Sequence, residues 1–190
     1  MANNFDSVIA NMKADGLISP TPLLEQAWLY RCARVFSGIG DIVELGTHYG
    51  ATAIVLAQAI RDSQNNSQVM TVEILPKTVE IADGNIVKFG FSEIISVIPG
   101  DDADVLGSVP DSSIAMIYVD SCHNGDHVAN ILRFMPWKVI PGGLICGHDY
   151  APWEAGVVKA VSEWRDNMLN LITGFSVYKT TWWALRCCQV

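Results

Sequence analysis

Acidic side chains recur at the ends of the short apolar segments of this chain. Five such segments, the first at residues 41–45 and the fifth at 144–147, each end in or run into a carboxylate. The acids are Glu44, Glu73, Asp101, Asp102, Asp120 and Asp149. Parallel strands place their carboxyl ends at one edge of a sheet, where ligands bind, so we expect these groups to gather there. Because like charges in one cleft repel, the cluster predicts a cationic ligand, a metal ion or several ligand hydroxyl groups.

Two histidines could add proton transfer to this cluster. His123 lies three residues after Asp120, and His148 directly precedes Asp149. An unperturbed imidazole titrates near neutral pH, so His123 is the candidate general base. The alternative is a histidine that starts a helix and faces solvent. His127, four residues after His123, could mimic a metal pair, but no third soft ligand is near it in the sequence.

From residue 41 onward, apolar runs alternate with helical patterns, which predicts βαβ units and a mostly parallel sheet. The expected strands are 41–45, 68–73, 94–98, 114–120, 144–147, 169–172 and 175–185. The expected helices are 51–61, 77–89, 102–106, 125–134 and 154–167. A tight turn around Gly174 should make the last two strands antiparallel. The fold class expected is α/β, a Rossmann-like three-layer sandwich whose mostly parallel seven-stranded sheet ends in an antiparallel C-terminal edge pair.

A length of 190 residues and a mass of 20.7 kDa predict one domain. We expect an N-terminal helical cap over residues 1–40 and a Rossmann-like core over 41–190. Within the cap, Thr21 is a plausible helix cap, with Pro22 at the first helical position. The apolar face of this helix would cover the sheet or a second copy of the chain, which is compatible with a homodimer.

The charge balance excludes some partners. The formal net charge is −8, the opposite of what a nucleic-acid-binding domain carries, and no basic cluster is present to hold an anionic membrane. The five cysteines are odd in number and form no CxxC pair, and the first residues lack the pattern of a secretion signal. These features predict a cytoplasmic protein with a small-molecule partner.

The turn after the first strand has the sequence Gly46-Thr47-His48-Tyr49-Gly50, and Glu73 follows at the distance of a ribose-binding acid. A nicotinamide dinucleotide is disfavoured, because the turn lacks the middle glycine of G-x-G-x-x-G and carboxylates would repel a pyrophosphate. S-adenosylmethionine fits better, since it offers a ribose, an adenine and two cationic groups without a phosphate.

Five motifs resemble those of the class I S-adenosylmethionine-dependent methyltransferases, most of all the small O-methyltransferase-like group related to methyltransferase family 24. They are ELGTHYGAT from Glu44, TVEILPKTVEIADGNIVKFGFS, VIPGDDADVL, IYVDSCH and PGGLICGHDY. The resemblance covers residues 41–150, and the closing antiparallel strands also suit the family. It implies cofactor contacts from Glu44, Gly46, Thr47, His48, Tyr49, Gly50, Glu73, Ile74, Asp101, Asp102, Ala103 and Asp120.

The resemblance also implies a metal site. In metal-dependent members an Asp after the fourth strand and an acidic pair after the fifth hold a divalent cation, and the matching positions here are Asp120, His148 and Asp149. His148 departs from the pattern, because an Asp or Glu often stands there and Mg²⁺ prefers oxygen ligands, whereas imidazole suits Mn²⁺ or Zn²⁺. Either His148 points away, or the metal differs, or no metal binds.

These observations predict a methyltransferase that moves a methyl group from S-adenosylmethionine to the hydroxyl of a small molecule, with or without a divalent cation such as Mg²⁺ or Mn²⁺. The catalytic residues expected are His123 and Asp120, and Tyr150 and Trp153 could stack on the acceptor. The alternatives are an inactive relative that binds S-adenosylmethionine and, less favoured, an NAD-dependent oxidoreductase.

Overall fold

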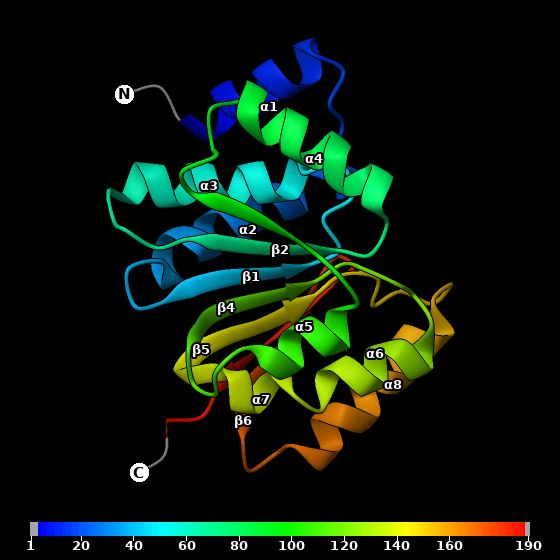
Figure 1. Ribbon diagram of the computed structural model, residues 1–190. Coiled ribbons are helices and arrows are strands. Elements are labelled where there is room, and N and C mark those ends of the chain that lie inside the picture. The colour runs from blue at the N-terminus through cyan, green and yellow to red at the C-terminus, as the bar shows by residue number, and fades with distance from the viewer. Residues whose placement is uncertain (1–3, 189–190) are drawn as a thin grey trace.

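The computed structural model describes residues 4–188 and shows a seven-stranded sheet with helices on both faces (Figure 1). The strand order is β3-β2-β1-β4-β5-β7-β6. The strands are β1 (Asp41–Leu45), β2 (Val69–Glu73), β3 (Ile95–Pro99), β4 (Ile114–Val119), β5 (Val139–Gly147), β6 (Ile172–Tyr178) and β7 (Thr181–Arg186). The first five strands pair in parallel, and β7 pairs antiparallel to both β5 and β6. The Rossmann-like fold with an antiparallel edge is therefore confirmed.

Helices divide between the two faces, and each face buries its own apolar core (Figure 1). One face is covered by α1 (Asn4–Ala14), α2 (Leu23–Phe36), α3 (Ala51–Ser63) and α4 (Pro76–Lys88). The other is covered by α5 (Asp102–Ser108), α6 (Gly125–Leu132), α7 (Met135–Lys138) and α8 (Ala155–Asn167). The two helices before β1 pack into the same core as α3, through Phe5, Val8 and Leu29.

The middle of the sheet is apolar on both sides because helices cover both. All six residues of β4 are buried, and so are the ten residues from Ala51 to Ile60 in α3. A continuous apolar run of this kind is typical of a parallel strand in a doubly covered sheet. This core fixes where β1 and β4 end, and the candidate site lies just beyond those ends.

The last two strands differ from the prediction. The turn between them is at Lys179 and Thr180, and Gly174 lies within β6, where it has a φ of 67° and the pairing with β7 is irregular. A glycine with positive φ marks a bulge as readily as a turn, which explains the error. The correction matters because it places Thr180 and Thr181 beside the candidate site.

Two smaller differences also come from backbone irregularities. Strand β5 begins at Val139 and not at the predicted residue 144, and residues 141–143 form an irregular part of it between the pairs Ile114↔Val139 and Met116↔Leu144. Thr21 does not cap α2, since Pro22 is the capping residue and makes no side-chain capping hydrogen bond. Among residues 4–188, no helix combines the length and apolar character that a membrane span requires.

Candidate active site

The turn after β1 brings the chain back close to the end of β4. Gly46 has a φ of 100°, and a Cβ atom on it would lie 2.3 Å from the carbonyl oxygen of Asp120. Gly50, with a φ of 84°, begins α3 against the backbone of Ala82. Only glycine fits the first of these positions without a backbone shift, so the spacing of the motif has a direct steric reason.

Glu73 at the end of β2 holds this turn in place. Its Oε2 accepts a hydrogen bond from the backbone N–H of His48 at 3.0 Å, and its Oε1 accepts one from the N–H of Leu75, also at 3.0 Å. The carboxylate thus joins the turns that follow β1 and β2. Because Glu73 also lines the cavity between them, its removal should disturb both the shape and the charge of that cavity.

A cavity of about 430 Å³ opens between these turns and the ends of β3 and β4. Its lining residues are Gly46, His48, Val72, Glu73, Ile74, Asp101, Asp102, Asp120, Ser121, Cys122 and His127. No lysine or arginine is among these described residues, and three of the acids come from three different strand ends. A ligand with hydroxyl groups and positive charge suits this donor set, whereas a pyrophosphate does not. Seven of the predicted cofactor residues therefore meet at one cavity.

His127, which the sequence left with little weight, faces this cavity. Its Nε2 lies 3.1 Å from Asp102 Oδ2, and that carboxylate is buried at the start of α5. Burial raises the pKa of Asp102, and the neighbouring His127 opposes the shift. Ser121 and Cys122 were also missed as lining residues, although they directly follow Asp120 in the motif.

The remaining predicted cofactor residues lie outside this cavity. Ala103 donates its backbone N–H to Asp101, which caps α5. Tyr49 stacks on His48 with ring centroids 3.9 Å apart, and Thr47 lines a second cavity instead. Glu44 is completely buried below the turn.

Glu44 supports the turn from beneath through two threonines. Its Oε2 accepts a hydrogen bond from Thr71 Oγ1 at 2.5 Å, and that hydroxyl lies 2.6 Å from Thr47 Oγ1. Its Oε1 has no hydrogen-bond partner among residues 4–188. Burial, opposed by the Thr71 hydrogen bond and assisted by the charge of Asp120, raises the pKa of Glu44 to about 8.

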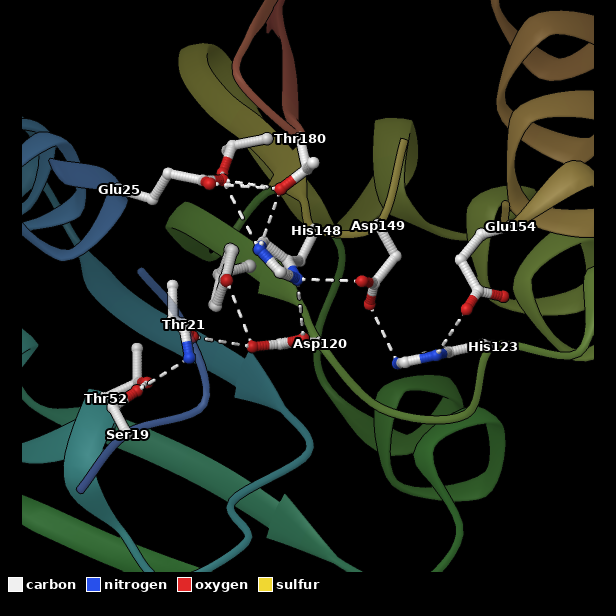
Figure 2. Close-up of polar contacts among 12 residues, drawn as sticks. Ser19, Thr21, Glu25, Thr52, Asp120, His123, His148, Asp149, Glu154 and Thr180 are labelled. Carbon is white, nitrogen blue, oxygen red and sulfur yellow. Dashed lines mark hydrogen bonds and ion pairs between the residues drawn. The ribbon is translucent and has the colours of Figure 1, made fainter. Parts of the chain in front are cut away.

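Asp120 stands between the cofactor-like cavity and a second cavity of about 280 Å³. Its Oδ2 accepts hydrogen bonds from Thr21 Oγ1 and Tyr118 Oη, each at 3.1 Å (Figure 2). Burial raises the pKa of Asp120, and the charge of His148 opposes this shift. The second cavity is lined by Pro20, Thr21, Gly46, Thr47, His48, Ala51, Thr52, Asp120, His123, His148 and Asp149.

His148 lines this second cavity and lies among three carboxylates (Figure 2). Asp120 and Asp149 line the same cavity, and Glu25 contacts the ring from outside it. Its Nδ1 is 3.1 Å from Asp149 Oδ1 and 3.5 Å from Asp120 Oδ1, and its Nε2 is 3.3 Å from Glu25 Oε2. Burial alone would lower the pKa of His148, but Asp149, Asp120 and Glu25 outweigh burial and raise it. Conversely, burial would raise the pKa of Asp149, but His148 and His123 lower it.

His123 lies at the open side of the same cluster. Its Nε2 is 2.8 Å from Asp149 Oδ2, and its Nδ1 is 3.5 Å from Glu154 Oε1 (Figure 2). Asp149 lines the second cavity whereas Glu154 does not, so Nε2 is the ring nitrogen on the cavity side. The candidate base and the predicted Asp120 therefore line the same cavity.

Glu25 is the member of this cluster that sequence reasoning missed. It lies in α2, is only 1% exposed, and accepts hydrogen bonds from Thr180 Oγ1 at 3.0 Å and from the hydroxyl of Thr181. A glutamate in the first turn of a helix usually faces solvent, so its local sequence gave no sign of burial. A buried carboxylate needs hydrogen-bond partners, and those of Glu25 come from a turn 155 residues away. The residues near Glu25 in the sequence therefore did not indicate its role.

The cluster offers three groups that could share a metal ion. Single donor atoms of Asp120, His123 and Asp149 all lie within 4.8 Å of one another. However, each group already has protein partners, and the ring of His148, whose pKa these carboxylates raise, lies against both of them. Metal ligands must present donor atoms free of hydrogen-bonding protons, so this arrangement fits a divalent cation poorly.

Comparison with known proteins agrees with this fold. Residues 43–150 match a protein family described as a methyltransferase domain. This span includes every motif that was taken to resemble a methyltransferase and more than half of the chain. The chain therefore belongs to this methyltransferase family, which confirms the expected class I S-adenosylmethionine-dependent methyltransferase.

Individual relatives are distant. A protein-L-isoaspartate O-methyltransferase from Staphylothermus marinus is 40% identical over 65 residues, which are 33% of this chain and 29% of that protein. The O-methyltransferase from Bacillus cereus, solved with SAH, aligns with a TM-score of 0.74 and 16% identity over 96% of this chain and 90% of that one. The O-methyltransferase TomG from Streptomyces achromogenes, solved with SAM, also gives 0.74, with 16% identity over 99% and 91%. The alignment with the curated relative spans less than a third of its length, and the two solved structures establish the fold.

Proposed function

We propose that the protein transfers a methyl group from S-adenosylmethionine to a hydroxyl oxygen of a small molecule. The observation that carries this proposal is Asp120, which lies on the wall shared by two cavities. One cavity has the acids that a cationic nucleoside requires, and the other has a histidine suited to proton transfer. Methyl transfer needs the two reactants to meet in line at such a boundary.

The cofactor cavity would be occupied by S-adenosylmethionine, which supplies the electrophilic methyl group. Glu73 is suited to accept hydrogen bonds from the ribose hydroxyls, and Asp102 with His127 lies on the far wall. Asp120 at the boundary provides negative charge where the sulfonium is expected. Glu44 acts indirectly in this proposal, because it lies beneath the turn and does not line the cavity.

His123 is the proposed general base. In this proposal Glu154 Oε1, 3.5 Å from Nδ1, orients the ring, and the acceptor hydroxyl approaches Nε2 beside Asp149 and gives its proton to that nitrogen. Asp149 Oδ2, 2.8 Å from that nitrogen, would stabilise the imidazolium that results. The chain's own side chains can thus both accept and hold the proton.

The acceptor would enter through a groove of about 530 Å³ that shares Pro20, His148 and Asp149 with the second cavity. Leu23, Leu24 and Trp153 line this groove, and Trp153 is 73% exposed. Exposed apolar side chains beside a polar reaction centre favour an acceptor with an aromatic or apolar body. The other residue expected to stack, Tyr150, instead hydrogen-bonds to Ser162 and packs against Phe175.

The divalent cation implied by the family resemblance has no role in this proposal, because both oxygens of Asp149 already have partners: Oδ1 lies 3.1 Å from His148 Nδ1, and Oδ2 lies 2.8 Å from His123 Nε2. A homodimer and a cytoplasmic location both remain predictions from the sequence.

Calorimetric titration of S-adenosylhomocysteine into the protein tests the cofactor site. We expect micromolar binding that Glu73→Ala weakens at least about tenfold, since the substitution removes a charged hydrogen-bond acceptor. Glu80→Ala is the matched control, because Glu80 is exposed on α4 and lines neither cavity. Equal binding by all three proteins, or by none of them, would contradict the proposed site.

Transfer of labelled methyl groups to a panel of phenols and other small alcohols tests the reaction. Turnover on any oxygen acceptor supports the proposal. If S-adenosylhomocysteine binds but no acceptor is methylated, the second candidate, an inactive relative that only binds the cofactor, becomes the better explanation.

A further inference from the structure

Both ring nitrogens of His148 face groups that accept hydrogen bonds. Nδ1 lies 3.1 Å from Asp149 Oδ1 and 3.5 Å from Asp120 Oδ1. Nε2 lies 3.3 Å from Glu25 Oε2 and 3.0 Å from Thr180 Oγ1, a hydroxyl that also lies 3.0 Å from Glu25 Oε2. An ionised carboxylate can only accept, so a proton on each ring nitrogen gives the ring a hydrogen-bond partner on both sides.

The carboxylates around His148 are held from separate parts of the fold. Glu25 comes from α2, Asp120 follows β4, and Asp149 follows β5 (Figure 2). Thr180 and Thr181 fix Glu25, and Thr21 with Tyr118 fixes Asp120. The ring of His148 is only 13% exposed, so its charge is poorly screened by water.

We propose that His148 is the resident cation of this site: its imidazolium balances Asp120 and Asp149 in place of a divalent metal, so that the protein methylates its acceptor without a metal ion. The inference rests on the proposed function for the methylation step only. The placement of the cation rests on the contacts of His148 alone.

The distances leave little room for both cations. A metal bound by Asp120 and Asp149 would have to accept ligand oxygens that already lie within 3.1–3.5 Å of Nδ1. It would also have to displace His123 from Asp149, where Nε2 lies 2.8 Å from Oδ2. Two positive groups side by side in a poorly hydrated site repel strongly. The imidazolium and the metal are therefore mutually exclusive occupants.

Glu25 is a positioning residue in this arrangement. It lines the outer groove rather than the two inner cavities, and it reaches the reaction centre only through His148. By accepting from Nε2–H it directs the other ring nitrogen, Nδ1, toward Asp120 and Asp149. The buried carboxylate of Glu25 also stabilises a positive charge on this ring.

The test is a titration of the full chain with Mn²⁺, with free ion measured by electron paramagnetic resonance. We expect the wild-type protein to show no binding below the millimolar range. His148→Asp replaces the cation by a third carboxylate, and a site with more oxygen charge should bind Mn²⁺ at least about 100-fold more tightly. His148→Asn removes the cation without adding a charge, and it should gain less, about tenfold.

Micromolar binding of Mn²⁺ by the wild-type protein that is lost in Asp149→Asn would overturn the proposal. So would a His148→Asp protein that is folded by circular dichroism but binds Mn²⁺ no better than the wild type. If His148→Asp fails to fold, the comparison of wild type with Asp149→Asn still decides the question.

A second measurement depends on the proposed function, because it requires turnover. Where turnover is found, EDTA should leave the wild-type rate unchanged, and a loss of activity restored by Mn²⁺ or Mg²⁺ would contradict the resident cation. The Mn²⁺ titrations do not depend on turnover or on an acceptor. A protein that methylates nothing but also binds no metal would therefore disprove the proposed function and leave the placement of the cation intact.

Discussion

Glu44 is a completely buried acid whose Oε1 has no hydrogen-bond partner in the part of the chain that the structure describes. Burial raises its pKa from the ordinary 4.5 to about 8. Between these two values the folded protein binds a proton that the unfolded chain has already released. Stability should therefore fall as the pH rises through this range, by up to about 1.4 kcal/mol per pH unit.

Glu44→Gln should remove this pH dependence, because an amide has the shape of the protonated acid and does not titrate. We expect urea denaturation at pH 5 to give similar free energies of unfolding for both proteins. At pH 8 the variant should be the more stable one. A wild-type protein whose stability rises from pH 5 to pH 8 as much as that of the variant would show that Glu44 is ionised in the fold.

His123→Gln tests the proposed base. The amide keeps the size and polarity of the ring but cannot take a proton, so kcat should fall by about 10²–10⁴-fold. Binding of S-adenosylhomocysteine should stay the same, since His123 does not line the cofactor cavity. Initial rates at saturating acceptor together with calorimetry separate the two effects. An unchanged kcat would assign the proton transfer to another group.

Some site residues could be predicted from the sequence and others could not, for a physical reason. Glu73, Asp102, Asp120 and Asp149 follow strands, and the topology of a parallel sheet alone brings strand ends together. Glu25 belongs to helix α2, and Thr21 lies in the loop before it. Their roles depend on how that helix packs. No local pattern encodes this packing.

At the level of elements, the turn after β1 can approach the end of β4 only because Gly46 has no side chain. Gly46→Ala would place a Cβ atom 2.3 Å from the Asp120 carbonyl oxygen, at a φ of 100° that alanine rarely adopts. We expect a loss of at least about 2 kcal/mol of stability and weaker binding of S-adenosylhomocysteine.

Gly84→Ala is the matched control for this substitution. Gly84 lies inside α4 with no atom within 4 Å of its Cβ position, so alanine should stabilise the protein by about 0.5–1 kcal/mol. Thermal unfolding of the two variants should move the midpoint in opposite directions. If both glycine substitutions shift it the same way, the close approach at Gly46 is not the cause.

The parallel part of the sheet was predictable because short, largely apolar runs alternate there with helical patterns, whereas the last hairpin was not. β6 is largely exposed, so its sequence lacks the apolar run that marks the central strands. Its bulge at Gly174 has the same signature as a turn. The position of the hairpin depends on the pairing of its second strand, β7, with β5. These two strands are far apart in the chain.

For the whole molecule, Glu25 joins the segment before β1 to the turn after β6 (Figure 2). Glu25→Ala would leave His148, Thr180 and Thr181 without their shared acceptor, which should cost about 3 kcal/mol of stability. S-adenosylhomocysteine should still bind, because the cofactor cavity is lined only by residues 46–127. Urea unfolding and calorimetry of the same preparation test both expectations, and a loss of cofactor binding in a folded protein would contradict them.

The two cavities also differ in how much of the chain must be made before each exists. Every residue that lines the cofactor cavity has been synthesised once the chain has grown to residue 127. Strand β5, which pairs with β4, is complete only at residue 147. The charge cluster on the acceptor side requires Glu25 from near the beginning and Thr181 from 156 residues later. Contacts of such long range form late and slowly during folding. A growing chain on the ribosome would therefore acquire its binding half first, and it could not methylate an acceptor until almost all of the sequence had emerged.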